Sequence, residues 1–153
     1  MKETYKYYWE DFPVGDVREI AATTVNREEM LRFSGEFDPQ PFHVDESAAA
    51  ESMYGGLIAS GWHTCSLAMR MMCDAYLVKS ASLGSPGMDS IKWLKPVRPG
   101  DSVRLRMTVL GARVLESKPH VGMIRWQWRL LNQNDQRVME MEGHSMLLRR
   151  PNG

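Results

Sequence analysis

The stretch from Gly61 to Lys79, which reads GWHTCSLAMRMMCDAYLVK, decides how the rest of the chain must fold. Its apolar residues recur with the 3.6-residue period of an α-helix. They are Trp62, Cys65, Met69, Met72 and Tyr76, with Leu67, Ala68 and Ala75 beside them. Because almost no polar face remains, we expect one helix over residues 61–79 that the rest of the protein nearly encloses.

The residues that follow this helix change to a two-residue period, which is typical of β-strands. Apolar residues alternate with arginines in Ser102–Val109, and apolar residues alternate with polar ones in Ile124–Leu130. The polar turn Asn132–Gln136 leads into a last strand over Arg137–Leu148, so this strand and the one before it form a hairpin. We also expect a short strand over Ile91–Val97.

The residues before the helix predict a strand and two short helices. Val17–Val25 is rich in β-branched residues and indicates a strand. Asn26, followed three residues later by a glutamate, is typical of a helix start and predicts a helix over Arg27–Phe37. The prolines of Asp38–Val44 predict a rigid loop, and Asp45 then caps a second helix that runs to about Tyr54.

Together these patterns predict an α+β fold of two layers, in which a twisted antiparallel sheet needs the helix to cover its apolar face. Gly84–Gly87 is expected to be only a turn that separates the helical part from the strands. No internal repeat or linker interrupts the chain, so we expect a single domain over residues 1–153.

Composition excludes several classes of protein. The 153 residues include 19 Lys and Arg against 19 Asp and Glu, and this net charge of zero argues against a nucleic-acid-binding protein. Met1–Phe12 carries charges and no apolar core, which is unlike a secretory signal, and Ser52–Met69 is too polar for a membrane helix. We therefore expect a soluble, cytoplasmic protein. Cys65 and Cys73 fit no metal or disulfide spacing and are expected to be core residues.

The candidate chemistry lies in the segment FDPQPFHVD, residues 37–45. Asp38 and His43 are separated by two prolines, so their relative positions cannot drift, and flanking phenylalanines indicate partial removal from water. A carboxylate and an imidazole aimed at one point can hold and polarise a water molecule for acid–base chemistry. The alternative is that Asp38 orders the turn and His43 packs against it.

This segment resembles the signature of the MaoC-like, or (R)-specific enoyl-CoA hydratase, branch of the hot dog fold, which runs small-Gly-Asp-x-Asn-Pro-x-His-x-Asp/Glu. Asp38, Pro41 and His43 match its Asp, Pro and His in register. Gln40 stands where the family usually has Asn, and Glu36-Phe37 replaces the usual Gly.

Two further stretches carry the resemblance over nearly the whole chain. Residues 57–62, LIASGW, resemble the family's Ile-Ala-His-Gly-Met turn into its central helix. Residues 93–101, WLKPVRPGD, resemble its usual strand and Pro-Gly-Asp turn. The resemblance implies the hot dog fold, an antiparallel β-sheet wrapped around a long central α-helix.

The resemblance also implies an activity, the addition of water to a trans-2-enoyl thioester or the reverse dehydration. Asp38 and His43 would bind the water, and a backbone N–H at the start of the central helix would stabilise the thioester oxyanion. Gly61 is the candidate donor because a glycine lets the substrate carbonyl approach closely, the alternative being a glycine needed only for close packing or capping. We expect Gln40, Ser60 and Trp62 to contact the substrate.

The expected carrier of the acyl group is coenzyme A, with no redox or metal cofactor. His63, His120 and His144 have no metal-ligand spacing and are expected to have ordinary core or surface roles. Met69, Met71 and Met72 could line an acyl tunnel, but the core is the favoured place for them. A basic region could bind coenzyme A phosphates or be a solvated edge of the sheet. It contains Lys92, Lys95, Arg98, Arg104 and Arg106.

Two other functions remain open at this point. One is a hot dog thioesterase, in which water attacks the thioester carbonyl itself. The other is a non-catalytic subunit that binds acyl thioesters. The intact pair of Asp38 and His43 argues against this second alternative.

Assembly is predicted from surfaces that a single subunit would leave uncovered. A sheet on one helix leaves a strand edge and an outer face exposed, and Ile124–Leu130 places two tryptophans on one face of a strand. Such surfaces predict a partner. The resemblance implies a homodimer at minimum, or a higher homo-oligomer, with the active site where the subunits meet.

Overall fold

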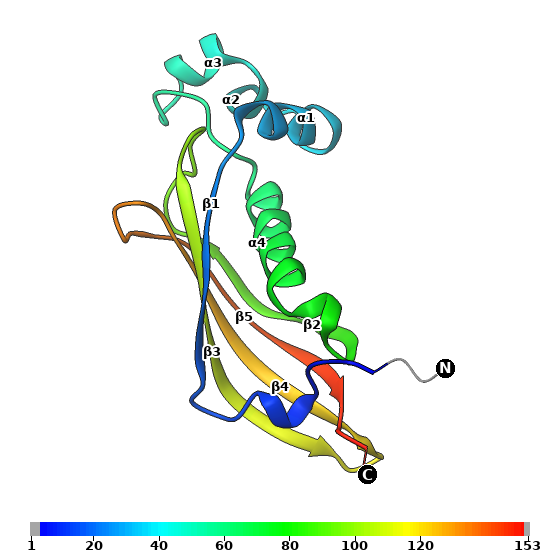
Figure 1. The fold of residues 1–153 in the computed structure, drawn as a ribbon. Helices are drawn as coiled ribbons and strands as arrows, with labels where there is room; N and C mark the ends of the chain where they lie inside the picture. The colour runs from blue at the N-terminus through cyan, green and yellow to red at the C-terminus, as the bar shows by residue number, and fades with distance from the viewer. Residues whose placement is uncertain (1–3, 152–153) are drawn as a thin grey trace.

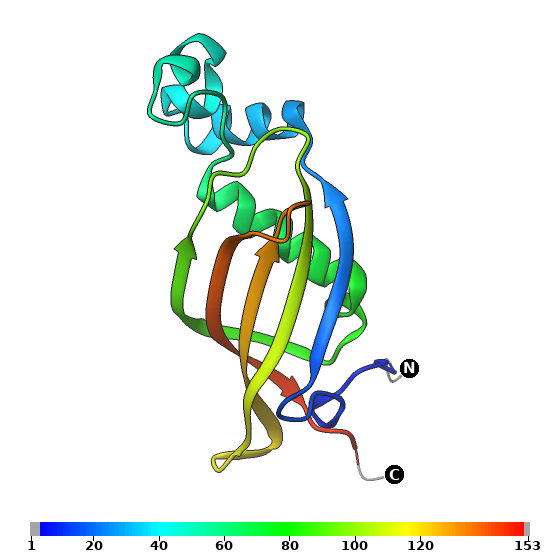
Figure 2. The same ribbon diagram turned by 90° about the vertical axis from the view of Figure 1, so that its left-hand side faces the viewer.

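A five-stranded antiparallel sheet wraps around one long helix, α4 (Figures 1 and 2). The strand order is β1-β3-β4-β5-β2. The strands are β1 (Val17–Thr24), β2 (Ser82–Trp93), β3 (Ser102–Leu115), β4 (Lys118–Leu131) and β5 (Arg137–Leu148). This arrangement confirms the expected α+β fold.

The computed structural model describes residues 4–151. The single domain expected over residues 1–153 includes residues 1–3 and 152–153, which lie outside the described part. The expectation of no secretory signal in Met1–Phe12 also includes residues 1–3. Among the described residues, no helix is long and apolar enough to span a bilayer.

The helical elements gather mainly at one end of the sheet. Three short helices lie together beside the start of α4 (Figure 1). The helices are α1 (Arg27–Phe37), α2 (Pro41–Val44), α3 (Glu46–Glu51) and α4 (Gly61–Ala75), and the 3-10 turns are η1 (Trp9–Asp11) and η2 (Leu77–Lys79). The expectation that the second helix runs to about Tyr54 was wrong, because the backbone becomes extended at Ser52. The chain between Thr24 and Gly61 therefore forms a cap over the N-terminal end of α4.

The core lies between the inner face of the sheet and α4. The apolar residues of β3, which are every second residue of the strand, point inward as expected, and Val103, Leu105 and Met107 are fully buried. Trp126 and Trp128 belong to this inner face and are 1% and 7% exposed. The expectation that these tryptophans need a second subunit to cover them was wrong, because α4 and the rest of the core cover them within one chain.

The central helix is shorter and more open than its sequence predicts. It ends at Ala75, because Tyr76 leaves the helical backbone and buries its ring 5.7 Å from that of Phe12. One face of α4 is uncovered, with Trp62 58% and Met69 48% exposed. The expected near-complete enclosure was wrong for one chain, because the sheet wraps around only one side of the helix.

The largest difference from the sequence expectation is in β2. The expected turn at Gly84–Gly87 lies inside this strand, and the expected strand over Ile91–Val97 is instead the end of it, since β2 stops at Trp93. Register shifts interrupt its pairing with β5 near these glycines. An edge strand tolerates proline and bulges because one side of its backbone needs no partner strand, so Pro86 does not end β2.

Candidate active site

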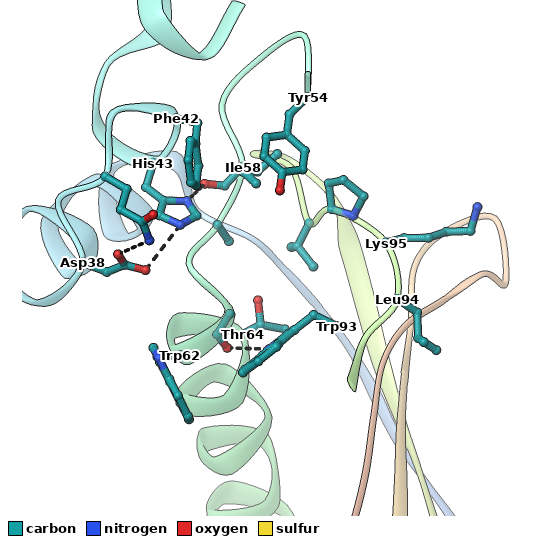
Figure 3. Close-up of a pocket in the computed structure, with 15 residues that line it drawn as sticks. Asp38, Phe42, His43, Tyr54, Ile58, Trp62, Thr64, Trp93, Leu94 and Lys95 are labelled. Atoms are coloured by element: carbon teal, nitrogen blue, oxygen red, sulfur yellow. Dashed lines mark hydrogen bonds and ion pairs between the residues drawn. The ribbon is translucent and has the colours of Figure 1, made fainter. Parts of the chain in front are cut away.

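A cavity of about 450 Å³ opens at the N-terminal end of α4, between the helical cap and the segment that follows β2. Figure 3 shows its side chains, with the carboxylate and imidazole at one end and Leu94 and Lys95 at the other. It is lined by Asp38, Gln40, Phe42, His43, Tyr54, Ile58, Ala59, Gly61, Trp62, Thr64, Trp93, Leu94, Lys95, Pro96 and Val97.

Local structure places Asp38 and His43 on this cavity. Asp38 is the C-cap of α1, and its backbone N–H donates to the carbonyl of Ser34 at 2.9 Å. The chain then turns at Gln40, and Pro41 begins α2 at a position where its missing N–H costs nothing. The expected rigid loop thus contains one helical turn, which carries His43 inward until it is 5% exposed.

The two side chains face each other as the sequence predicts. Nε2 of His43 lies 3.3 Å from Oδ2 of Asp38. Nδ1 of His43 lies 2.8 Å from the carbonyl oxygen of Ile58, which can only accept a hydrogen bond, so Nδ1 carries the hydrogen. The ring nitrogen free to exchange a proton is therefore Nε2.

Two further polar side chains hold Asp38. Nε2 of Gln40 donates to Oδ1 of Asp38 at 2.7 Å, and the Ser60 hydroxyl donates to Oδ2 at 2.7 Å. Burial raises the pKa of Asp38, but the bonds from Gln40 and Ser60 and the charge of His43 together outweigh it, so this pKa lies below its usual value. The arrangement keeps Asp38 ionised beside the imidazole.

These contacts show what the expected substrate residues touch within the chain. Gln40 lines the cavity and also bonds Asp38. Ser60 is fully buried behind the carboxylate, where its oxygen also accepts from the N–H of Trp62 at 3.3 Å as the N-cap of α4. Trp62 is half exposed and lines the cavity.

Gly61 begins α4, where backbone N–H groups lack helical partners. Among residues 4–151, no acceptor bonds the N–H of Gly61. A Cβ atom built on Gly61 would lie 2.5 Å from a ring carbon of Trp93, so close packing by itself requires glycine here. The structure therefore explains the glycine by packing and leaves its N–H available for a ligand.

Several lining residues were not expected in the site from the sequence. Trp93 reaches the cavity from the end of β2, Tyr54 from the segment after α3, and Thr64 from α4 (Figure 3). The carbonyl of Ile58, which orients His43, is backbone and carries no residue-type signal at all.

The basic region does not act as one surface. Arg104 forms an ion pair with Asp135 at 2.6 Å and Arg106 one with Glu19 at 2.7 Å. Only Lys95 of this region lines the cavity, and Arg98 bonds the backbone carbonyl of Tyr54. Both arginines lie on β3, between β1 and β4, so the expectation of a solvated edge of the sheet was wrong for them.

The other candidate residues lie away from the cavity. His63 is 5% exposed, and its Nε2 lies 3.9 Å from Glu29. Met71 and Met72 are buried in the core, as favoured, whereas Met69 is 48% exposed, so the core was wrong for it.

Cys65 and Cys73 are only partly buried instead of being core residues, and Cys65 contacts Met139 at 3.7 Å. Within residues 4–151, His, Cys, Asp and Glu side chains form no group of three or more that could hold a metal ion.

Comparisons with known proteins agree with this fold. Residues 11–125 match the family model described as MaoC like domain. A MaoC-like dehydratase from Rhodospirillum rubrum is 38% identical, with a TM-score of 0.86 over 94% of this chain and 98% of that chain.

Two solved structures of lower identity share the fold. The R-hydratase of Pseudomonas aeruginosa in its unliganded form is 21% identical, with a TM-score of 0.75 over 94% of this chain and 86% of that one. A protein of Mycobacterium tuberculosis described as having a double hotdog fold is 17% identical, with a TM-score of 0.83 over 95% of this chain and 45% of that one. The expected hot dog fold is confirmed.

The family match covers most of the chain, and together with the R. rubrum dehydratase it supports hydratase or dehydratase chemistry in general. The chain belongs to the MaoC-like domain family.

Proposed function

We propose that this protein adds water to an enoyl thioester, or removes it from a 3-hydroxyacyl thioester, with coenzyme A as the carrier. One observation carries the proposal: Asp38 and His43, 3.3 Å apart, both line the cavity at the N-terminal end of α4. A carboxylate, an imidazole and a helix N-terminus in one cavity are the groups that this reaction needs.

In the hydration direction, a water molecule bound between Asp38 and His43 attacks C3 of the enoyl group. The pair removes one proton from the water while the hydroxyl group bonds to C3, and it returns a proton to C2. Nε2 of His43 is the ring nitrogen for this exchange, because Nδ1 is held by the carbonyl of Ile58.

The attack at C3 moves negative charge onto the thioester oxygen. In the proposal, this oxygen binds the N–H of Gly61, where the positive end of the helix dipole also stabilises it. Gln40 and Trp62 line the same cavity, and in the proposal they contact the substrate. The balance of atoms needs only water and the thioester, so we expect no redox or metal cofactor.

The test is a spectrophotometric assay of trans-2-enoyl-CoA thioesters with the purified full chain, before and after treatment with a chelator. A hydratase removes the enoyl ultraviolet absorbance without releasing free thiol, and chelation leaves the rate unchanged. Release of free thiol would identify the thioesterase instead. Binding of every thioester without turnover of any would identify the non-catalytic subunit and refute the proposal.

We also propose that the chain acts as a homodimer or a higher homo-oligomer. Among the described strands, β2 lies at one edge of the sheet and pairs only with β5, and its residues are mostly exposed. Leu83 and Met88 expose 45% and 40% of their surface on this strand, and the uncovered face of α4 exposes Met69. A long edge strand with apolar side chains is a surface that a second copy can cover.

A further inference from the structure

Tyr54 places a hydroxyl group in the cavity that no residue of the described chain uses. Its ring is partly buried and packs against the ring of Phe42, with centroids 5.4 Å apart. Its hydroxyl group points into the cavity (Figure 3), and among residues 4–151 it has no hydrogen-bond partner. A phenolic hydroxyl can both donate and accept, so a ligand in the cavity can bond to it in either sense.

The backbone of Tyr54 is also held in place. Its N–H donates to the Ser52 hydroxyl at 3.2 Å, and its carbonyl accepts from the guanidinium group of Arg98. The same guanidinium packs on Gly56, where a Cβ would lie 3.2 Å from Nη1 of Arg98. Arg98 therefore contacts the segment that carries Tyr54 at two residues.

The charge of Arg98 has no other partner within the part of the chain that the structure describes. Arg104 and Arg106 form ion pairs with carboxylates, but no described carboxylate pairs with the guanidinium of Arg98. The backbone N–H of Arg98 donates to Oδ2 of Asp101 at 2.9 Å, which fixes the arginine at the turn before β3. The arginine thus joins this turn to the segment that carries Tyr54.

The part of the substrate that reaches Tyr54 follows from the chemistry proposed above. With C3 at the aspartate–histidine pair and the thioester oxygen at Gly61, the sulfur and the carrier arm continue through the cavity away from the pair. Figure 3 shows Leu94 and Lys95 at that end, and the hydroxyl group of Tyr54 faces the space before them.

The carrier arm brings an amide group into this space. Coenzyme A and acyl carrier proteins both hold the acyl group on pantetheine, whose first amide nitrogen is two carbons from the sulfur. An amide beside the apolar Pro96 and Val97 loses hydrogen bonds to water unless a polar side chain replaces them. Two hydroxyl groups line the cavity, and that of Thr64 already donates to the carbonyl of Ser60 at 3.3 Å. The hydroxyl of Tyr54 remains for the amide.

We propose that Tyr54 binds the first amide of the carrier arm, and that Arg98 is the positioning residue that holds Tyr54 over it. The proposal rests on the function proposed above. Tyr54 touches the substrate away from the reacting carbons, so its bond is equally strong before and during the reaction. Such a bond lowers KM and leaves kcat unchanged.

The experiment compares two crotonyl thioesters that differ in this amide. Crotonyl-N-acetylcysteamine contains it, and S-butyl crotonothioate has a hydrocarbon chain in its place. Tyr54→Phe should raise KM for the first thioester by about 3- to 10-fold, the size of one net hydrogen bond, with kcat unchanged. The same variant should keep the wild-type kcat/KM for the second thioester.

Arg98→Leu should show the same selective rise in KM, and Arg98→Lys should show a smaller one, because an ammonium group can also donate to the carbonyl of Tyr54. Combining Arg98→Leu with Tyr54→Phe should raise KM no further than Tyr54→Phe alone, since both changes remove one contact. Arg149→Leu is the matched control. Arg149 donates to the carbonyl of Pro119 at 3.0 Å outside the cavity, so both thioesters should keep their wild-type constants.

An unchanged KM in folded Tyr54→Phe, or an equal loss with both thioesters, would overturn the inference. Additive effects of the two substitutions would refute the role of Arg98. Circular dichroism and thermal unfolding check each variant, and Arg98→Lys replaces Arg98→Leu if the latter does not fold.

If either small thioester reacts too slowly to measure, the KM for crotonyl-CoA, which contains the same amide, decides by the same criterion. Hydration of crotonyl-CoA by the wild type leaves the proposed function standing whatever Tyr54→Phe shows. A folded wild type that hydrates no thioester would refute both proposals.

Discussion

The Ser60 hydroxyl donates a hydrogen bond to Oδ2 of Asp38 at 2.7 Å, while its oxygen accepts from the first turn of α4. One side chain thereby joins the N-cap of the central helix to the carboxylate of the proposed catalytic pair. The ionisation of Asp38 and the start of α4 are coupled through this residue.

Replacing Ser60 with alanine should move the acidic limb of the pH profile of kcat/KM to higher pH. The bond from Ser60 helps to lower the pKa of Asp38, so its loss raises that pKa, and the carboxylate becomes protonated earlier as the pH falls. The measurement is the rate of enoyl-CoA hydration across the acidic range. A limb that does not move would show that Asp38 is not the group that titrates.

Asn26→Ala is the control for the lost helix cap. Asn26 caps α1 through a 2.9 Å bond from the N–H of Glu29 and touches nothing in the cavity. Loss of either cap should lower the free energy of unfolding by about 1 kcal/mol, but only Ser60→Ala should change the pH profile.

Asp38→Asn and His43→Ala should each lower kcat by about 10²-fold or more, as expected when a general acid or base is removed. The chain offers a second pair of the same type as a control. Nδ1 of His144 lies 3.6 Å from Oδ2 of Asp89, on strands β5 and β2 and outside the cavity. Asp89→Asn and His144→Ala should keep wild-type turnover, and near-normal turnover of Asp38→Asn would remove the carboxylate from the mechanism.

Gly61→Ala should lose both stability and activity, because its Cβ meets the ring of Trp93. If packing is the only reason for the glycine, adding Trp93→Leu should restore the melting temperature and the hydration of crotonyl-CoA. A double variant that is stable and still inactive would instead show that the substrate carbonyl needs the bare glycine backbone. Thermal unfolding and the hydration assay distinguish the two outcomes.

His63 should make the protein less stable as the pH falls below neutrality. Burial lowers the pKa of His63, Glu29 partly opposes this, and Arg32 adds to it, so the folded-state pKa lies below the ordinary value of 6.5. As the pH falls through 6.5, the unfolded chain takes up the proton first, and the free energy of unfolding decreases. Denaturant unfolding from pH 7.5 to 5 should show a shallower decrease for His63→Phe, and parallel curves would contradict the prediction.

The assembled protein should have at least twice the 17.5 kDa mass of one chain in light scattering at micromolar concentration. An interface that both subunits need for activity should bury about 2,000 Å² or more. Leu83→Lys places a charge on the exposed edge of β2 and should weaken the dimer and the activity together. A fully active monomer would refute the shared interface.

Local signals in the sequence were sufficient for the elements that place Asp38 and His43. The predicted bounds of α1 agree with the structure, and both predicted N-caps form, with Asn26 accepting from Glu29 and Asp45 from Ser47 and Ala48. Caps and periodicity act between residues at most four positions apart, so they can be recognised without knowledge of the fold.

The contacts that complete the site join residues far apart in the chain. Ser60 reaches Asp38 across 22 residues, and Trp93 reaches Gly61 across 32. In the sequence, Ser60 suggests a substrate contact and Gly61 suggests a close approach by substrate. Only the folded chain shows that Ser60 supports the carboxylate and that Gly61 makes room for an indole.

The sequence by itself determined the order of one strand, then helices, then further strands, together with the two-layer fold and the placement of an aspartate and a histidine on one short rigid segment. The tertiary structure decided that β2 continues through Gly84 and Gly87, that one face of α4 stays open, and that Trp93 lines the cavity. The physical reason is that propensity and periodicity report on neighbours along the chain. A strand edge, a helix face and a cavity wall depend on which distant segments pack there.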